Sequence, residues 1–145
     1  MVANVEAHGQ TQGARALRRG IDLLRTRGVL LVLSDLYDDE DGVHTELRRA
    51  ARIGHDVVVF HVLTPDEVRL VVHGATEFED AETGQRVFAG PSAAAEHEKH
   101  MAAFVNRWRE RCATYGIDYC GVRTDAPLDT MLRGYLLQRR GAPRR

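Results

Sequence analysis

The sequence predicts an α/β fold built on a small parallel sheet. Two short apolar runs, residues 29–34 and 56–63, have the length of strands and the composition of strands buried on both faces. Amphipathic helical patterns precede, separate and follow these runs, and glycines stand at the joints between them. Helices that alternate with strands are typical of right-handed parallel crossovers, so we expect about three parallel strands flanked by helices.

The first half of the chain alternates helix and strand with short joints. A first helix is expected to end at Gly28, directly before the first strand. A second helix is expected over residues 42–53, with acidic residues 39–41 at its positive end and Gly54 after its last turn. The apolar stripe of the first helix consists of Ala14, Leu17, Ile21 and Leu24.

The second half of the chain carries the longest helix, expected over residues 93–115. Ser92 is expected to cap this helix and Gly116 to end it. Residues 117–122 read as a third strand, less apolar than the other two and therefore expected at an edge of the sheet. A final helix opens at Pro127. The inward stripe of the longest helix consists of Met101, Phe104, Val105, Trp108 and Cys112.

One domain is expected over residues 13–140, between a flexible segment at 1–12 and a disordered basic tail at 141–145. Within it, short β-like pieces predict a β-hairpin insertion over residues 68–90. These pieces are residues 69–73, 76–79 and 86–88, with a turn at residues 82–85.

Composition excludes several classes of protein. A net charge of −1 provides no basic excess for nucleic acid, which we do not expect as a partner. No apolar run is long enough to span a bilayer, and the first residues lack the apolar core of a signal peptide. The two cysteines match no metal or redox spacing, so we expect reduced thiols and a cytoplasmic location.

The strand over residues 29–34 is expected near the centre of its sheet, where it needs a neighbour on both sides. The remaining pattern supplies too few strands for that, so the first strand of such a fold is expected to be missing from this chain. An open strand edge promotes pairing with another chain, and we therefore expect self-association.

Ser34 and Asp35 stand at the carboxyl end of the first strand, where open parallel sheets bind their ligands. Two interpretations of Asp35 remain open: a water-mediated metal ligand, or a carboxylate that caps backbone amides of the next loop. A small flavodoxin-like hydrolase or phosphate-handling enzyme using Asp35 is the alternative function. The sequence has no glycine-rich phosphate loop after any strand, which argues against that alternative.

Other clusters favour structural roles. Acidic residues 38–41 fail the calcium-loop spacing and read as a solvated loop before a helix. His97 and His100 share a helix face but lack a third ligand, and His61 lies within an apolar strand as a core histidine. The two thiols, Cys112 and Cys120, have no predicted activating partner.

The order and spacing of several segments resemble the domain of unknown function 58 family, whose members carry a von Willebrand factor A-like domain. The match runs over residues 9–140. The segments that carry it are RGVLLVLSDLYDD at 27–39, GHDVVVFHVL at 54–63, FEDAETG at 78–84, GIDY at 116–119 and TDAPLD at 124–129.

The resemblance implies a partial von Willebrand A-like, Rossmann-type fold. In the complete fold a divalent cation is held by a DxSxS loop, a Thr before a helix and an Asp after the following strand. Thr11 resembles that Thr and Asp35 that Asp, with Ser34 as a further oxygen, whereas DxSxS is absent from this sequence. Mg²⁺ wants about six oxygens, so the site is expected to be incomplete and Mg²⁺ binding weak or absent in this chain alone.

The resemblance also implies a binding scaffold rather than an enzyme. Family members are encoded near MoxR-type AAA+ ATPases and are thought to act with them in complex assembly or metal insertion. We therefore expect a non-catalytic module that binds a protein partner on the upper face of the sheet, or else a truncated product without independent function. The residues expected on that face are Asp35, Tyr37, Asp38, Thr124 and Asp125.

Overall fold

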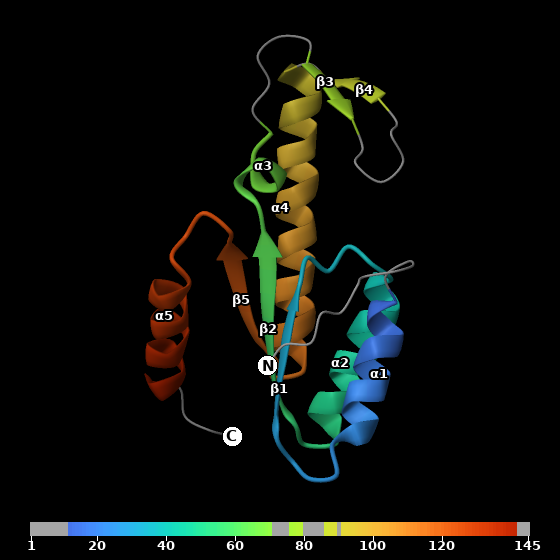
Figure 1. Ribbon diagram of the computed structural model, residues 1–145, viewed down its shortest axis with the longest axis vertical. Coiled ribbons are helices and arrows are strands. Elements are labelled where there is room, and N and C mark those ends of the chain that lie inside the picture. The colour runs from blue at the N-terminus through green and yellow to red at the C-terminus, as the bar shows by residue number, and fades with distance from the viewer. Residues whose placement is uncertain (1–11, 71–75, 80–85, 90, 142–145) are drawn as a thin grey trace, which may run out of the picture.

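The computed structural model describes residues 12–70, 76–79, 86–89 and 91–141, and confirms a mixed α/β fold (Figure 1). Along the chain the elements are α1 (Gly13–Leu23), β1 (Val29–Ser34), α2 (Glu40–Arg52), β2 (Asp56–Leu63), α3 (Pro65–Val68), β3 (Thr76–Glu79), β4 (Arg86–Ala89), α4 (Pro91–Thr114), β5 (Asp118–Arg123) and α5 (Leu128–Gly141). In this part of the chain, none of the helices combines the length and the apolar character needed to cross a membrane.

The main sheet has three parallel strands in the order β1-β2-β5. β2 is the central strand and β5 lies at an edge, as its lower apolar content predicts. β3 and β4 pair in antiparallel fashion and confirm a hairpin within the expected insertion. Its turn at residues 82–85 lies outside the described residues, and the first expected piece forms no strand at Arg69 or Leu70.

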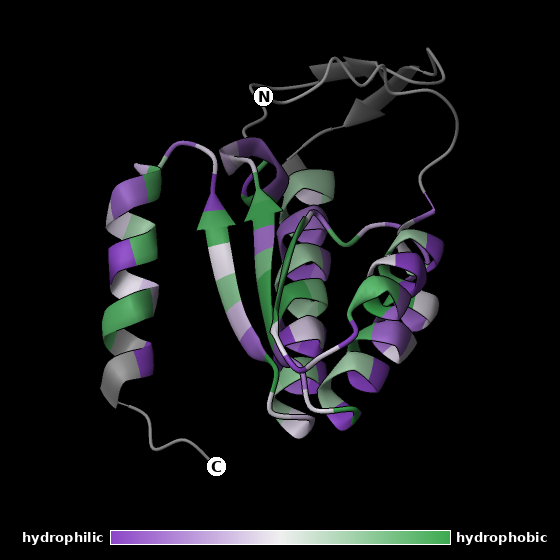
Figure 2. Cartoon of the chain, turned by 60° about the horizontal axis from the view of Figure 1, so that its bottom comes forward, coloured by the Kyte–Doolittle hydropathy of each residue, from purple (hydrophilic) through white to green (hydrophobic). Residues whose placement is uncertain are grey.

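Helices cover the two faces of this sheet unequally (Figure 2). α1, α2 and α4 pack on one face, around β2 side chains such as Val57 and Val59. The stripe predicted for the longest helix lies in that core, with Trp108 and Cys112 fully buried. α5 packs on the other face, where Met131 and Tyr135 meet a smaller cluster formed by Val58, Phe60 and Val122.

β1 differs from its prediction as a central strand buried on both faces. Its side chains alternate: Leu30 and Val32 pack against the main core, whereas Val29, Leu31 and Leu33 are 57%, 55% and 67% exposed. Among the described residues, β2 is the only strand beside β1. The prediction was wrong because the small cluster under α5 involves β2 and β5, and leaves the same face of β1 uncovered.

Several helix ends also differ from their predictions. α1 ends at Leu23, well before Gly28, because Leu24 already has an extended backbone. α2 begins earlier than expected, at Glu40, since Asp39 caps it by accepting a hydrogen bond from the Gly42 amide at 3.1 Å. α4 begins at Pro91, whose fixed φ suits a first helical position, so Ser92 lies inside the helix instead of capping it.

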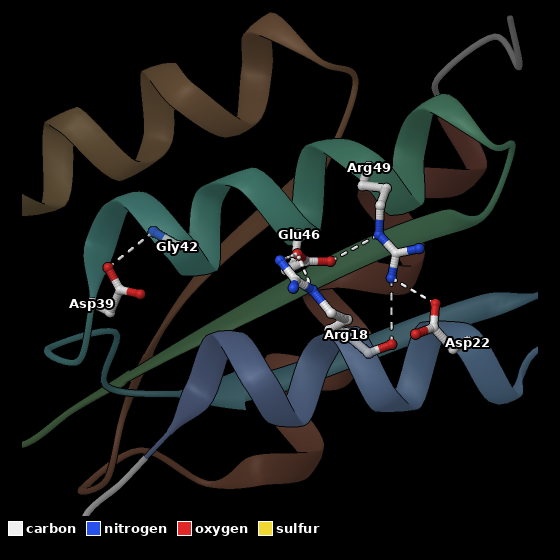
Figure 3. Close-up of polar contacts among 6 residues, drawn as sticks. All are labelled: Arg18, Asp22, Asp39, Gly42, Glu46 and Arg49. Carbon is white, nitrogen blue, oxygen red and sulfur yellow. Dashed lines mark hydrogen bonds and ion pairs between the residues drawn. The ribbon is translucent and has the colours of Figure 1, made fainter.

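An ion-pair network centred on the buried Glu46 joins α1 to α2 (Figure 3). Glu46 is only 2% exposed, and its carboxylate accepts hydrogen bonds from Arg18 and Arg49, each at 2.8 Å. Arg49 also reaches Asp22 at 2.9 Å. Burial raises the pKa of Glu46, but the two guanidinium groups outweigh it and hold the pKa below its ordinary value. The charged Glu46 thereby ties α1 to α2.

Candidate functional site

A tight turn over residues 34–37, the Asp35 turn, follows β1 directly. The Ser34 Oγ accepts a hydrogen bond from the Leu36 amide at 3.0 Å, and Asp35 Oδ1 accepts one from the Tyr37 amide at 3.3 Å. Leu36 has a φ of 60°, a left-handed conformation that is unusual for a bulky residue. Its side chain is 2% exposed in the main core, and this burial offsets a backbone strain of about 1–2 kcal/mol.

His61 of β2 anchors the Asp35 turn from below. Its imidazole is fully buried, with Nε2 2.9 Å from the Asp35 carbonyl oxygen and Nδ1 2.6 Å from the Tyr119 hydroxyl. A carbonyl oxygen only accepts, so Nε2 carries the hydrogen and Tyr119 donates to Nδ1. Burial lowers the pKa of His61, which favours this neutral form. The interpretation of His61 as a satisfied core histidine is confirmed.

A groove of about 330 Å³ opens between the Asp35 turn and α4. We call it the α4 groove, and its lining residues are Tyr37, His97, His100, Met101, Ala103, Phe104 and Arg107. Met101 and Phe104 are buried and form its apolar floor, while His100 and Arg107 are exposed at its rim. The seven residues come from two segments about 60 positions apart in sequence, which the fold brings together.

Aromatic contacts fix the wall of the α4 groove. The Tyr37 ring stacks on Phe104 with centroids 5.2 Å apart and planes within 10° of parallel, and its hydroxyl lies 3.7 Å from the Met101 sulfur. The edge of His61 meets the same Phe104 ring at 5.4 Å. Burial, with the nearby charges of Glu67 and Asp35, raises the pKa of Tyr37 to about 12, so this phenol stays neutral.

The rim of the α4 groove offers hydrogen-bond donors. The Arg107 guanidinium lies over the Phe104 ring at 5.6 Å and pairs with Glu40 at 3.2 Å. His97 is already engaged, because its Nε2 lies 2.8 Å from the Glu67 carbonyl oxygen. No carboxylate or thiol side chain belongs to the described residues that line the groove. The groove therefore combines an apolar floor with hydrogen-bond donors at its rim.

The acidic residues after the Asp35 turn bind backbone amides at helix starts or form ion pairs with arginines. Asp38 Oδ2 accepts a hydrogen bond from the Gly13 amide at 2.6 Å, at the start of α1, so this predicted partner contact has a structural role. Asp39 caps α2, while Glu40 and Asp41 both pair with Arg111. Each of these carboxylates therefore contacts a backbone amide or an arginine side chain.

The expected metal ligands form only a partial set. Asp35 is exposed, and its carboxylate lies 3.5 Å from the Ser34 hydroxyl, which places two oxygen donors side by side. Thr11 lies outside the described residues. In the described ranges, no group of three or more His, Cys, Asp or Glu side chains is arranged to hold a metal ion. Two donors fall short of the roughly six oxygens that Mg²⁺ prefers, so the described residues do not fit a complete site.

Thr124 and Asp125 lie at the same end of the sheet as the Asp35 turn, since β1 and β5 are both parallel to β2. β2 separates the two strands, so these residues follow the opposite edge strand. The Thr124 amide donates to the Leu63 carbonyl at 3.0 Å, and Asp125 forms a two-pronged pair with Arg123 at 2.9 and 2.6 Å. Both residues are exposed but neither lines the α4 groove.

Neither cysteine has the environment of a nucleophile. Burial raises the pKa of the Cys112 thiol to about 11 and also raises that of Cys120. Both therefore keep their protons at neutral pH.

A second pocket of about 360 Å³ lies at the opposite end of the sheet, between α4 and α5. Arg109 lies over the Tyr119 ring there at 5.9 Å, and Arg139 over Tyr135 at the same distance. Arg139 is already engaged by Asp56 and by the Tyr135 hydroxyl, at 2.7 Å for the latter. This pocket has no predicted site residue and its charges are largely satisfied within the chain.

Sequence reasoning missed Arg107 and the groove itself. Met101 and Phe104 were predicted as core residues, which they are. His97 and His100 were weighed as metal ligands, and a role as polar helix positions was favoured. The available signal was helical spacing: positions 97, 100, 104 and 107 follow one helix face and include polar residues beside the apolar stripe. No local sequence pattern predicts that Tyr37 lies against that face of α4.

Comparison with known proteins supports one relationship. A family model described as "Protein of unknown function DUF58" matches residues 2–108, a range that includes the Asp35 turn and every residue of the α4 groove. The comparisons with curated proteins and with solved structures returned no match.

Proposed function

The chain belongs to the DUF58 family of proteins of unknown function, and on that premise we propose that it is a non-catalytic protein-binding module whose partner docks in the α4 groove. The observation that carries the proposal is the combination of an apolar floor, a stacked Tyr37 and Phe104 wall, and an exposed Arg107 at the rim. Tyrosine, methionine, aromatic residues and arginine are the types enriched at protein interfaces.

The chemistry of the groove defines the partner. Its floor accepts an aromatic or aliphatic side chain, and the donors of Arg107 and His100 suit a carboxylate next to that side chain. A volume near 330 Å³ is at the small end of ligand pockets and suits one large anchoring residue. We therefore propose a partner segment that presents an apolar residue beside an acidic one.

A MoxR-type AAA+ ATPase is the first partner we propose, on the resemblance set out above. In this proposal the chain is a von Willebrand A-type module that helps such an ATPase in complex assembly or maturation. The neutral His61 and the buried Leu36 fix the backbone conformation of the Asp35 turn. Tyr37 is therefore held in a defined position, which supports a binding role.

The alternative, a hydrolase or phosphate-handling enzyme using Asp35, gains no support from the described residues. The Asp35 carboxylate accepts the Tyr37 amide and lies beside Ser34, as a turn cap does. His61, the nearest histidine to this turn by hydrogen bonding, is committed through both ring nitrogens to Asp35 and Tyr119.

The test measures the affinity of the chain for a purified MoxR-type ATPase from the same genome by biolayer interferometry. Arg107→Ala and Tyr37→Ala are each expected to weaken binding about tenfold or more, the usual effect of removing an interface anchor. Arg109→Ala is the matched control, because Arg109 is also exposed on α4 and also lies over an aromatic ring, but outside the groove.

Equal losses for Arg107→Ala and Arg109→Ala would contradict the α4 groove as the docking site. A wild-type chain that does not bind the ATPase would remove this ATPase as the partner.

A further inference from the structure

Among the residues that the structure describes, none pairs with the outer edge of β1, which presents a regular row of backbone groups. The Asp56 amide donates to the Gly28 carbonyl at 2.9 Å, so the even-numbered residues of this segment point their backbone groups toward β2. Backbone direction alternates along a strand, and the N–H and C=O groups of Val29, Leu31 and Leu33 therefore point away from β2. These are the same three residues whose side chains are exposed on the α5 face.

The β1 segment itself carries none of the sequence features that normally protect an open strand edge. The sequence VLLVLS contains no proline, no charged residue and no glycine, and β1 pairs with β2 in unbroken register from Val29 to Ser34. Natural sheets usually blunt exposed edges with lysine, proline, bulges or a covering element. β5, the other edge strand, has Asp118 and Arg123 at its ends and Gly121 within it.

We propose that two copies of this chain pair through β1, in antiparallel fashion, around a two-fold axis at Leu31. Antiparallel pairing of outward-facing residues places Leu31 opposite Leu31 of the second copy, and Val29 opposite Leu33. Each of these three opposed pairs is a hydrogen-bonded pair that exchanges two backbone hydrogen bonds. The row of backbone groups that point away from β2 is thus complementary to itself, which is what a two-fold interface requires.

The pairing joins two three-stranded sheets into one of six strands, within the usual size of sheets in globular proteins. The exposed side chains of both β1 strands then form one row of directly opposed apolar pairs on the α5 face. The assembly stops at two copies because each β1 edge is then paired. The charged residues of β5 disfavour further pairing at the other edge of the sheet. The α4 groove lies on the opposite face of the sheet, so this dimer leaves the proposed partner site open.

The experiment compares two double variants by sedimentation velocity over a range of concentrations, with circular dichroism as the check of folding. Val29→Lys with Leu33→Lys places like charges opposite each other across the two-fold axis, and should raise the dimer Kd at least tenfold. Val29→Lys with Leu33→Glu removes the same apolar side chains but opposes unlike charges, and should remain a dimer. Residues 29 and 33 are four apart on one strand, so the charge difference acts between copies.

Leu136→Lys is the control for non-specific association through exposed apolar residues. Leu136 lies on α5 and its exposed fraction is 56%, nearly the same as that of Leu31. It should keep the wild-type Kd. A wild-type chain that stays monomeric throughout would overturn the proposal. So would equal Kd values for the two double variants, or a loss of the dimer with Leu136→Lys alone.

Discussion

At the scale of single residues, three side chains set the shape of the Asp35 turn. His61 holds the Asp35 carbonyl, Tyr119 holds His61 in the required tautomer, and Leu36 inserts into the core from a left-handed backbone. The strain at Leu36 is tolerated because its side chain is almost completely buried. The position of Tyr37 in the α4 groove follows from these contacts.

His61 makes the stability of the fold depend on pH. Burial lowers its pKa below the ordinary 6.5, so between that lowered value and pH 6.5 the unfolded chain binds more protons than the folded one. Stability is therefore full above pH 6.5 and falls as the pH drops below it. Urea unfolding at pH 7.5 and 5.5 should show this loss in the wild-type chain and a smaller loss in His61→Gln.

Burial lowers the pKa of His44 in the same direction, so the variant with both histidines replaced should show the weakest pH dependence. An unchanged loss of stability in that double variant would contradict the assignment.

Asp35 is predicted to bind Mg²⁺ weakly, because the described residues place only the Ser34 hydroxyl beside its carboxylate. Calorimetry with MgCl₂ should give no sub-micromolar binding to the wild-type chain. Any small heat of Mg²⁺ binding should disappear in Asp35→Ala. Sub-micromolar affinity would mean that further oxygens complete the site. Binding that persists in Asp35→Ala would place the cation elsewhere.

At the scale of elements, single side chains and one glycine determine where helices begin and end. Asp38 accepts a hydrogen bond from the first amide of α1. Asp39 caps α2, and Glu46 joins the two helices through arginines (Figure 3). Gly116 ends α4 with a φ of 66°, a conformation that costs a residue with a side chain more than it costs glycine. These contacts orient the helices that flank the Asp35 turn.

Two glycine-to-alanine substitutions are predicted to change the free energy of unfolding in opposite directions. Gly116→Ala should destabilise the fold by about 1 kcal/mol because of its positive φ alone, since no atom lies within 4 Å of the added Cβ. Gly134 lies inside α5 with the same open surroundings, so Gly134→Ala should stabilise by about 0.5–1 kcal/mol. Urea unfolding of both variants measures the difference, and effects of the same sign would contradict this account.

At the scale of the whole molecule, the sheet separates two surfaces with different chemistry. The α4 face carries the larger core and a polar-rimmed groove, whereas the α5 face leaves Val29, Leu31 and Leu33 exposed beside a smaller cluster. Figure 2 shows this imbalance, with α5 on one side of the sheet and α1, α2 and α4 on the other. One domain thus offers a proposed partner site and a proposed self-pairing edge that do not compete.

Self-pairing through β1 predicts a melting temperature that depends on protein concentration. A dimer of folded chains stabilises the folded state by mass action, so the wild-type Tm should rise as the chain is concentrated. Val29→Lys with Leu33→Lys should melt at a Tm independent of concentration. Differential scanning calorimetry over a hundredfold range of concentration tests both outcomes, and a constant wild-type Tm would count against the dimer.

The sequence by itself determined the alternation of helix and strand, the burial of β2 on both faces, the edge position of β5 and the inward stripe of α4. These features follow from periodicity and from glycines such as Gly54 and Gly116, which act within a few residues of the chain. Asp35 at the end of β1 was also predicted, because a strand end is a local feature.

Only the tertiary structure decided which face of β1 is exposed, which residues hydrogen-bond to His61, and the existence of the α4 groove. VLLVLS is apolar at five consecutive positions, so periodicity cannot tell which face a neighbour covers; the packing of α5 on β2 and β5 leaves Val29, Leu31 and Leu33 exposed. Tyr37 meets Phe104, and His61 meets Tyr119, across about 60 residues of chain. Contacts at that separation depend on how the sheet and helices pack, which no local pattern records.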